Sequence, residues 1–129
     1  ALRPLGRLLL RRLEGVHQHG YVHCDLQPAN ILFGRSSSAS VAEQIQEQHR
    51  PFLIDFGAAH PFPGGRPQRA DFGSVDFNSM HSAEDGATRT PFDDLESLGW
   101  VLVHGLVSEL PWFSITRGAR WTRGKLEDG

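Results

Sequence analysis

Short apolar segments that run directly into polar loops constrain the fold of this chain more than any other feature. Residues 21–22 (Tyr-Val) precede a polar loop that begins at His23, and residues 31–33 (Ile-Leu-Phe) follow that loop at once. Residues 52–54 (Phe-Leu-Ile) form another such segment, which runs into Asp55. Apolar runs of this length, bounded by polar residues, are typical of short strands. The pattern therefore predicts short strands around polar loops.

Residues 2–19 predict an amphipathic helix, because their apolar residues recur at spacings of four, four and three. The apolar stripe consists of Leu5, Leu9, Leu13 and Val16. The opposite side carries polar residues, namely Arg3, Arg7, Arg11, Glu14 and Gln18. Gly20 is expected to end this helix.

Residues 90–110 predict a second helix. Thr90 is a suitable N-cap, Pro91 fits the first helical position, and Asp93 stands where a capping box requires an acid. The apolar residues cover much of the circumference, which is typical of a buried helix. They are Leu95, Leu98, Val101, Leu102 and Leu106. Pro111 is expected to terminate the helix.

Three segments between and after these elements have no clear periodicity. Residues 34–50 are rich in Ser and Gln, and they are expected to form a surface loop or insertion, partly helical over 41–48. Residues 58–73 hold three Pro and three Gly and are expected to form a long irregular loop, functional or mobile. Residues 113–129 are poorly specified.

Composition excludes several classes of protein. The formal net charge is −2, so the chain lacks the basic field of nucleic-acid binders, and no nucleic-acid partner is expected. The single cysteine, Cys24, cannot form an internal disulfide and is interpreted as a small buried side chain rather than a nucleophile. The apolar stretches are too short for a membrane span and no signal-peptide pattern is present, so we expect an intracellular protein, cytoplasmic or nuclear, without a membrane partner. The start without Met, almost directly in a helical pattern, indicates a piece of a longer protein.

Three polar residues beside the predicted strands form a candidate catalytic and metal site. Asp25 precedes Asn30 in the first polar loop, and Asp55 directly follows an apolar segment. Carboxylate and amide oxygens are the hard ligands that Mg²⁺ prefers, and Mg²⁺ in turn binds nucleotide phosphates. Asp25 could also accept the proton or hydrogen bond of an attacking hydroxyl. Each motif alone is common, but in this order they are a strong signal.

These motifs resemble those of the protein-kinase superfamily. Residues 23–30 (His-Cys-Asp-Leu-Gln-Pro-Ala-Asn) resemble the catalytic loop H-R-D-L-K-P-x-N, and residues 55–57 resemble D-F-G. Residues 93–102 with the later Leu-Pro-Trp, and Gly-Ser followed by Phe-Asn-Ser within residues 73–79, resemble the casein kinase 1 and vaccinia-related kinase branch. The resemblance covers about residues 5–112.

The resemblance implies an α+β fold over residues 1–129, namely the C-terminal lobe of a partial kinase catalytic domain. Such a lobe is mainly helical, with short β-hairpins at the active-site cleft, and the N-terminal lobe would be missing. The catalytic loop would lie in residues 21–33, the insertion in 34–50, the D-F-G and activation segment in 55–80, and the central helix in 90–110.

The resemblance also implies an ATP-dependent serine/threonine protein kinase that uses Mg²⁺ and acts on a protein substrate. Asp25 would be the catalytic base, and Asn30 and Asp55 would hold Mg²⁺ against the phosphates. Leu32 and Ile54 would line the adenine site. Further implied roles are a substrate contact for Ser74 and structural roles for His23 and Asp94.

Two departures from the family pattern lie in the catalytic loop. Gln27 occupies the catalytic position of the lysine that would contact the transferring phosphate, and Cys24 replaces an arginine that binds an activating phosphate. Residues 58–73 contain no Ser, Thr or Tyr, so we expect no phosphorylation switch there. No Gly-rich loop or V-A-I-K strand is present in these residues.

Two alternatives to the protein kinase remain open. Small-molecule phosphotransferases of the aminoglycoside or choline kinase type also resemble His-x-Asp followed by Asn and Ile-Asp-Phe-Gly, although residues 93–112 are not expected in them. The second alternative is a pseudokinase that serves as a binding scaffold. The isolated fragment is expected to be inactive under any of these hypotheses.

Overall fold

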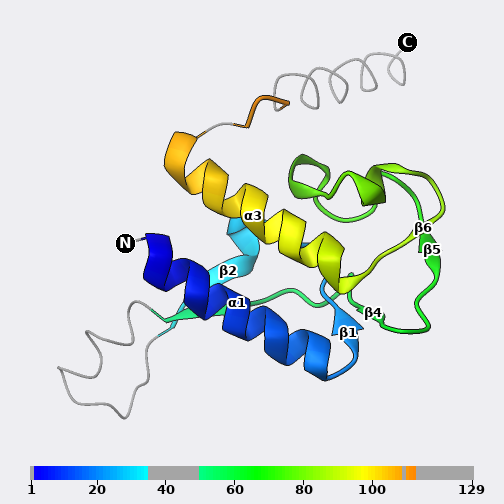
Figure 1. Ribbon diagram of the computed structural model, residues 1–129, viewed down its shortest axis with the longest axis horizontal. Helices are drawn as coiled ribbons and strands as arrows, with labels where there is room; N and C mark the ends of the chain where they lie inside the picture. The colour runs from blue at the N-terminus through cyan, green and yellow to red at the C-terminus, as the bar shows by residue number, and fades with distance from the viewer. Residues whose placement is uncertain (1, 35–49, 109, 113–129) are drawn as a thin grey trace.

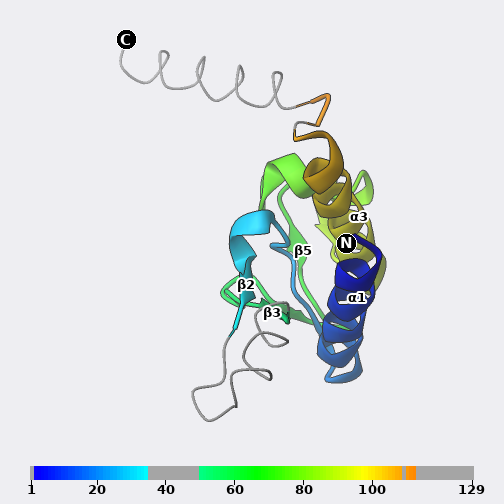
Figure 2. The same ribbon diagram turned by 90° about the vertical axis from the view of Figure 1, so that its left-hand side faces the viewer.

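The computed structural model describes residues 2–34, 50–108 and 110–112, and it is an α+β arrangement of two helices with short antiparallel strands (Figure 1). Helix α1 (Leu2–Gln18) packs against helix α3 (Pro91–Val107). Figure 2 shows the helices on one side and the strands with their connecting loops on the other. The described residues contain no helix that is long and apolar enough to cross a membrane.

Helix α1 confirms the predicted amphipathic helix to within one residue at its C-terminal end. Leu9 and Leu13 are buried, whereas the five polar residues predicted for the other side are all exposed. Gly20 follows the helix with φ of 83°, a conformation that costs glycine little. Arg12 ties the helix to the strand layer, since its Nε donates to the Pro51 carbonyl at 3.1 Å.

Helix α3 begins where the sequence predicts, with a capping box. The Thr90 side chain accepts from the backbone of Asp93, and the Asp93 carboxylate accepts from the backbone N–H of Thr90 at 2.7 Å. The predicted end at Pro111 is wrong: the helix ends at Val107, because Ser108 adopts a left-handed conformation with φ of 64° and donates to a backbone carbonyl within the last turn. The predicted helix of 90–110 is therefore too long at its C-terminal end.

The expected burial of α3 is only partly correct. Leu98 and Val101 are buried, but Leu95 is 41% exposed and Leu106 is 69% exposed. One face of the helix contributes to the core, and the other carries apolar side chains on the surface of the described residues. The two core clusters consist of Leu9, Leu13, Leu26 and Leu98, and of Phe77, Val101 and Leu110.

Within the described residues, six short strands form three antiparallel pairs, and they include the strands predicted around the first polar loop. The pairs are β1 (Tyr21–Val22) with β4 (His60–Pro61), β2 (Ile31–Phe33) with β3 (Pro51–Leu53), and β5 (Pro67–Gln68) with β6 (Ala87–Thr88). The chain also forms short 3₁₀ helices at Pro28–Asn30, Val75–Phe77 and His81–Ala83.

The expectation of an irregular loop over residues 58–73 needs a correction, because β4 and β5 lie within it. Each has two residues, which is too short to show an alternating pattern, and each pairs with a distant part of the chain. The strand predicted at 52–54 is present but one residue earlier, at Pro51–Leu53. The loop expected at 34–50, except for its first and last residues, and the tail at 113–129 lie outside the described residues.

Candidate active site

The loop of residues 23–30 brings Asp25 and Asn30 together. It leaves β1 and ends in a 3₁₀ turn, within which the Asn30 N–H donates to the Gln27 carbonyl at 3.0 Å. The Asn30 side-chain Nδ2 donates to the Asp25 backbone carbonyl at 2.7 Å and to its Oδ2 at 3.2 Å. Asn30 is 5% exposed, so this pairing sets the direction of its amide group.

Asp55 lies next to this loop because the preceding residue, Ile54, is hydrogen-bonded to the loop. The Ile54 N–H donates to the Asn30 carbonyl at 2.9 Å, which continues the β2–β3 pairing by one step. Asp55 itself has φ of 59°, and its Oδ1 accepts from the Gly57 N–H at 3.2 Å. The carboxylate is exposed at the edge of the loop, adjacent in the chain to the partner of Asn30.

His23 is the buried link between the two loops. Its ring Nε2 lies 2.9 Å from the Ile54 carbonyl, and its ring Nδ1 lies 3.1 Å from the Asp25 N–H. Since the amide must donate to Nδ1, the ring is the neutral tautomer with its proton on Nε2, and it donates to Ile54. The ring also meets Phe56 edge-on, with 4.9 Å between centroids. His23 thus connects the two loops through its ring nitrogens.

Asp94, the fourth residue of α3, supports the 23–30 loop through hydrogen bonds to the loop backbone. It is 2% exposed, and its carboxylate accepts from the backbone N–H groups of His23 at 2.8 Å and Cys24 at 3.0 Å. His17 Nε2 contributes a third contact at 2.8 Å. This arrangement stabilises the turn at Cys24, whose φ is 70°. Burial, assisted by the Asp94 charge, raises the pKa of the Cys24 thiol to about 12, in keeping with its interpretation as a buried side chain.

Ser74, which directly precedes the 3₁₀ helix at Val75–Phe77, also contacts the site. Its hydroxyl donates to Asp25 Oδ1, so that Asp25, Asn30 and Ser74 form one hydrogen-bonded group. Gly73 makes this approach possible, because a Cβ at this position would lie 2.3 Å from the Cys24 carbonyl oxygen, and its φ is 78°. Sequence reasoning missed Gly73 as a site residue; its only signal was a glycine directly before Ser74.

Gln27 and Ser74 line a pocket of 310 Å³ beside Asp25. The other lining residues are Gly73, Val75, Asp76 and Phe77. The two residues predicted for the adenine site lie on or next to the β2–β3 hairpin: Leu32 is 51% exposed on β2, and Ile54 is half-buried just after β3.

The side-chain oxygens of Asn30 and Asp55 are ligands that suit a hard divalent cation. The amide nitrogen of Asn30 is engaged by Asp25, so its amide oxygen is the atom that remains for a ligand role. One oxygen of Asp55 accepts from Gly57, which leaves the other. In the described part of the chain, no group of three or more His, Cys, Asp or Glu side chains could hold a metal ion. Two oxygen ligands with water and phosphate oxygens are the usual Mg²⁺ arrangement, so the residues fit that ion.

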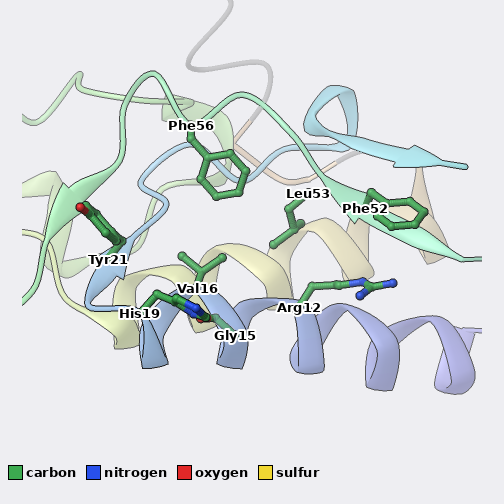
Figure 3. Close-up of a pocket in the computed structure, with 8 residues that line it drawn as sticks. All are labelled: Arg12, Gly15, Val16, His19, Tyr21, Phe52, Leu53 and Phe56. Carbon is green, nitrogen blue, oxygen red and sulfur yellow. The ribbon is translucent and has the colours of Figure 1, made fainter.

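A larger apolar cavity of 390 Å³ lies beside this site (Figure 3). Its walls come from α1, β3 and the residues that follow, and Figure 3 shows Leu53 and Phe56 directed toward the helix at Val16. No acidic side chain lines it. We therefore take the Asp25 group, and not this cavity, as the candidate active site.

Comparison with known proteins gives the following similarities, although no family model matches the chain. The chain is 35% identical over 101 residues to nucleosomal histone kinase 1 of Drosophila melanogaster, a match that covers 75% of the chain and 15% of that protein. It is 29% identical over 116 residues to serine/threonine-protein kinase VRK2 of Homo sapiens, covering 84% of the chain and 21% of that protein. It is 33% identical over 109 residues to casein kinase 1-like protein HD16 of Oryza sativa subsp. japonica, covering 78% and 14%. The chain thus spans no more than 21% of the length of these relatives.

Proposed function

This chain belongs to the casein kinase 1 and vaccinia-related kinase branch of the protein kinases, and from this premise we propose that the longer protein is an ATP- and Mg²⁺-dependent serine/threonine protein kinase. The described residues would form part of its C-terminal lobe. The observation that carries the proposal is the hydrogen-bonded group of Asp25, Asn30 and Ser74 between the two loops. We place this protein inside the cell, with protein substrates and without a nucleic-acid or membrane partner.

In the proposed reaction, Asp25 orients the substrate hydroxyl and accepts its proton or hydrogen bond. The contact between Ser74 and Asp25 Oδ1 supports this role, because it shows that a hydroxyl can reach this oxygen and donate to it. Asn30 keeps the Asp25 carboxylate oriented through its bond to Oδ2. Asn30 and Asp55 would hold Mg²⁺, which supplies positive charge against the nucleotide phosphates.

The roles of the supporting residues follow from the same geometry. Asp94 accepts from the His23 N–H, and the His23 ring accepts from the Asp25 N–H. These contacts fix the loop backbone and thereby keep the Asp25 carboxylate in the position that the substrate needs. Leu32 and Ile54 would contact the adenine from the β2–β3 hairpin. Gln27 lines the pocket beside Asp25 as a neutral side chain, so it can donate a hydrogen bond to a phosphoryl oxygen but supplies no charge.

Two variants of the full-length protein test these assignments against each other. We expect Asp25→Asn to lower kcat about 10²- to 10⁴-fold while the affinity for Mg²⁺-ATP stays nearly constant. We expect Asp55→Asn to weaken Mg²⁺-ATP binding, because it removes a metal ligand. Asp71→Asn is the matched control, since Asp71 is an exposed carboxylate of the 55–80 segment that pairs with an exposed arginine.

The outcomes separate the proposed function from its alternatives. If both variants lose only nucleotide affinity, Asp25 is not the base. If the full-length protein phosphorylates aminoglycosides or choline but no protein, the small-molecule phosphotransferase is correct. The neutral Gln27 favours the pseudokinase scaffold as second candidate, and binding of a protein partner with no transfer to any acceptor would establish it.

A further inference from the structure

Arg89 is a buried cation that lies between β6 and the start of α3. It is 3% exposed, which is unusual for an arginine without a carboxylate partner in direct contact. No sequence motif pointed to this residue. Its guanidinium is directed at the end of the 55–80 segment, next to the candidate active site.

The guanidinium of Arg89 joins two residues of that segment. Its Nη2 donates to the Phe72 carbonyl at 2.7 Å, and its Nη1 donates to Asn78 Oδ1 at 3.2 Å. The Asn78 Nδ2 donates to the same Phe72 carbonyl at 2.8 Å, which closes a triangle. The guanidinium carbon also lies 5.7 Å from the centre of the Phe72 ring. Arg89 Nε is buried and has no hydrogen-bond partner in the described part of the chain.

The triangle encloses the stretch that reaches the active site. Gly73, directly after Phe72, lies against the Cys24 carbonyl, and the next residue, Ser74, donates to Asp25. Arg89 therefore links residues 72 and 78, while Gly73 and Ser74 between them lie against the 23–30 loop. Loss of the Arg89 contacts would leave the Asn78–Phe72 hydrogen bond as the remaining side of the triangle, and so would loosen both ends of this stretch.

The segment beside Arg89 lacks the two groups that a phosphate switch needs. The family position for a phosphate-binding arginine is occupied by Cys24, and residues 58–73 contain no hydroxyl that could be phosphorylated. Burial lowers the pKa of Arg89, whereas the nearby groups Cys24, Asp93 and Asp94 act to raise it. An arginine remains charged in such surroundings, and hydrogen bonds from a charged donor are stronger than neutral ones.

We propose that Arg89 is a positioning residue that holds residues 72–78 against the catalytic loop, so that the segment is ordered without a phosphate. The inference rests on the proposed kinase function and concerns its regulation. In kinases that are switched by phosphorylation, a new phosphate meets an arginine and orders this segment. Here two nitrogens of the arginine already donate, one to a backbone carbonyl and one to an asparagine.

The test uses the full-length protein after phosphatase treatment, with Arg89→Met to remove the donors at similar volume. We expect the KM for a protein substrate to rise about 10- to 100-fold, the range for loss of hydrogen bonds to a charged group, with the KM for ATP nearly unchanged. Amide hydrogen exchange should become faster in residues 72–79 and stay constant in α3. Arg89→Lys should recover part of the loss, because an ammonium can donate to one acceptor well but lacks the planar fork. Arg66→Met is the control, an exposed arginine of the same segment.

Each outcome either supports or overturns the proposed role of Arg89. If Arg89→Met changes neither the KM for protein nor the exchange of residues 72–79, or if phosphatase treatment of the wild type abolishes activity, the proposal is wrong while the kinase function stands. If no protein is phosphorylated at all, the kinase function is wrong, and the exchange measurement alone decides the role of Arg89. Should Arg89→Met fail to fold, Asn78→Ala is expected to give the same local increase in exchange, and a constant exchange rate there would overturn the proposal.

Discussion

Replacement of Asp94 should be among the most destabilising single changes in this chain. Its buried carboxylate accepts from the backbone N–H groups of His23 and Cys24 and from His17. Asp94→Ala leaves two buried amides without an acceptor, and each such group costs about 1–3 kcal/mol. Lost contact with His17 and the space left behind add to this cost. We expect the free energy of unfolding to fall by about 3–5 kcal/mol.

Asp94→Asn separates charge and hydrogen bonding from the loss of volume. The two backbone amides bind different oxygens, Oδ1 for Cys24 and Oδ2 for His23, and an asparagine keeps only one oxygen. Its NH₂ group would therefore face one of the two N–H donors. We expect a loss of about 2–3 kcal/mol, because one buried amide remains unpaired whichever way the side chain turns.

Urea denaturation of the full-length protein measures both effects, provided that the slope of the transition stays constant between variants. Hydrogen exchange at the amides of His23 and Cys24 should increase in parallel. Asp71→Asn, at an exposed carboxylate, should change the free energy of unfolding by less than about 0.5 kcal/mol. A loss below about 1 kcal/mol for Asp94→Ala would refute the reasoning, since the loop amides would then have another acceptor.

Three further predictions concern single side chains. Gln27→Lys should raise kcat in the full-length protein, because a cation there would stabilise charge on the phosphoryl oxygens by about 1–3 kcal/mol; an unchanged rate in a peptide assay would mean that another cation serves. Cys24, with its pKa raised by burial to about 12, should react with iodoacetamide at pH 8 on the order of 1,000-fold more slowly than in urea, and equal rates would contradict its burial. Burial acts to raise the pKa of Asp93, but hydrogen bonds led by that of Ser79 hold it below its ordinary value of 3.8, so its stabilising effect should be present above that pH and be lost as pH falls further. Urea midpoints at pH 7 and pH 3 should therefore differ less for Asp93→Asn than for the wild type.

The features that could be predicted from the sequence are those that depend on near neighbours in the chain. The leucine spacing of α1 and the capping box of α3 involve residues within four positions of each other, and the structure confirms both. The pairing of Asp25 with Asn30 is similarly local. The pattern of the 23–30 loop therefore indicated where these side chains meet, and the resemblance supplied their expected roles.

The features that could not be predicted depend on contacts between distant residues. Strand β4 exists because it pairs with β1, and two residues are too few for any periodicity to show. Arg89 showed no signal, since its acceptors are a backbone carbonyl at Phe72 and a side chain at Asn78, and neither follows from a motif. The early end of α3 also escaped prediction, because Ser108 adopts a left-handed conformation before Pro111 is reached.

The neighbouring acids Asp93 and Asp94 combine a local contact with a distant one at the start of α3. Asp93 caps its own helix by accepting from Thr90, so it sets the residue at which α3 begins. Successive residues of a helix point about 100° apart, so Asp94 faces a different part of the structure from Asp93. That part is the backbone of His23 and Cys24, about 70 positions earlier in the chain. The capping box therefore stabilises the helix that carries Asp94, and Asp94 supports the conformation of the 23–30 loop.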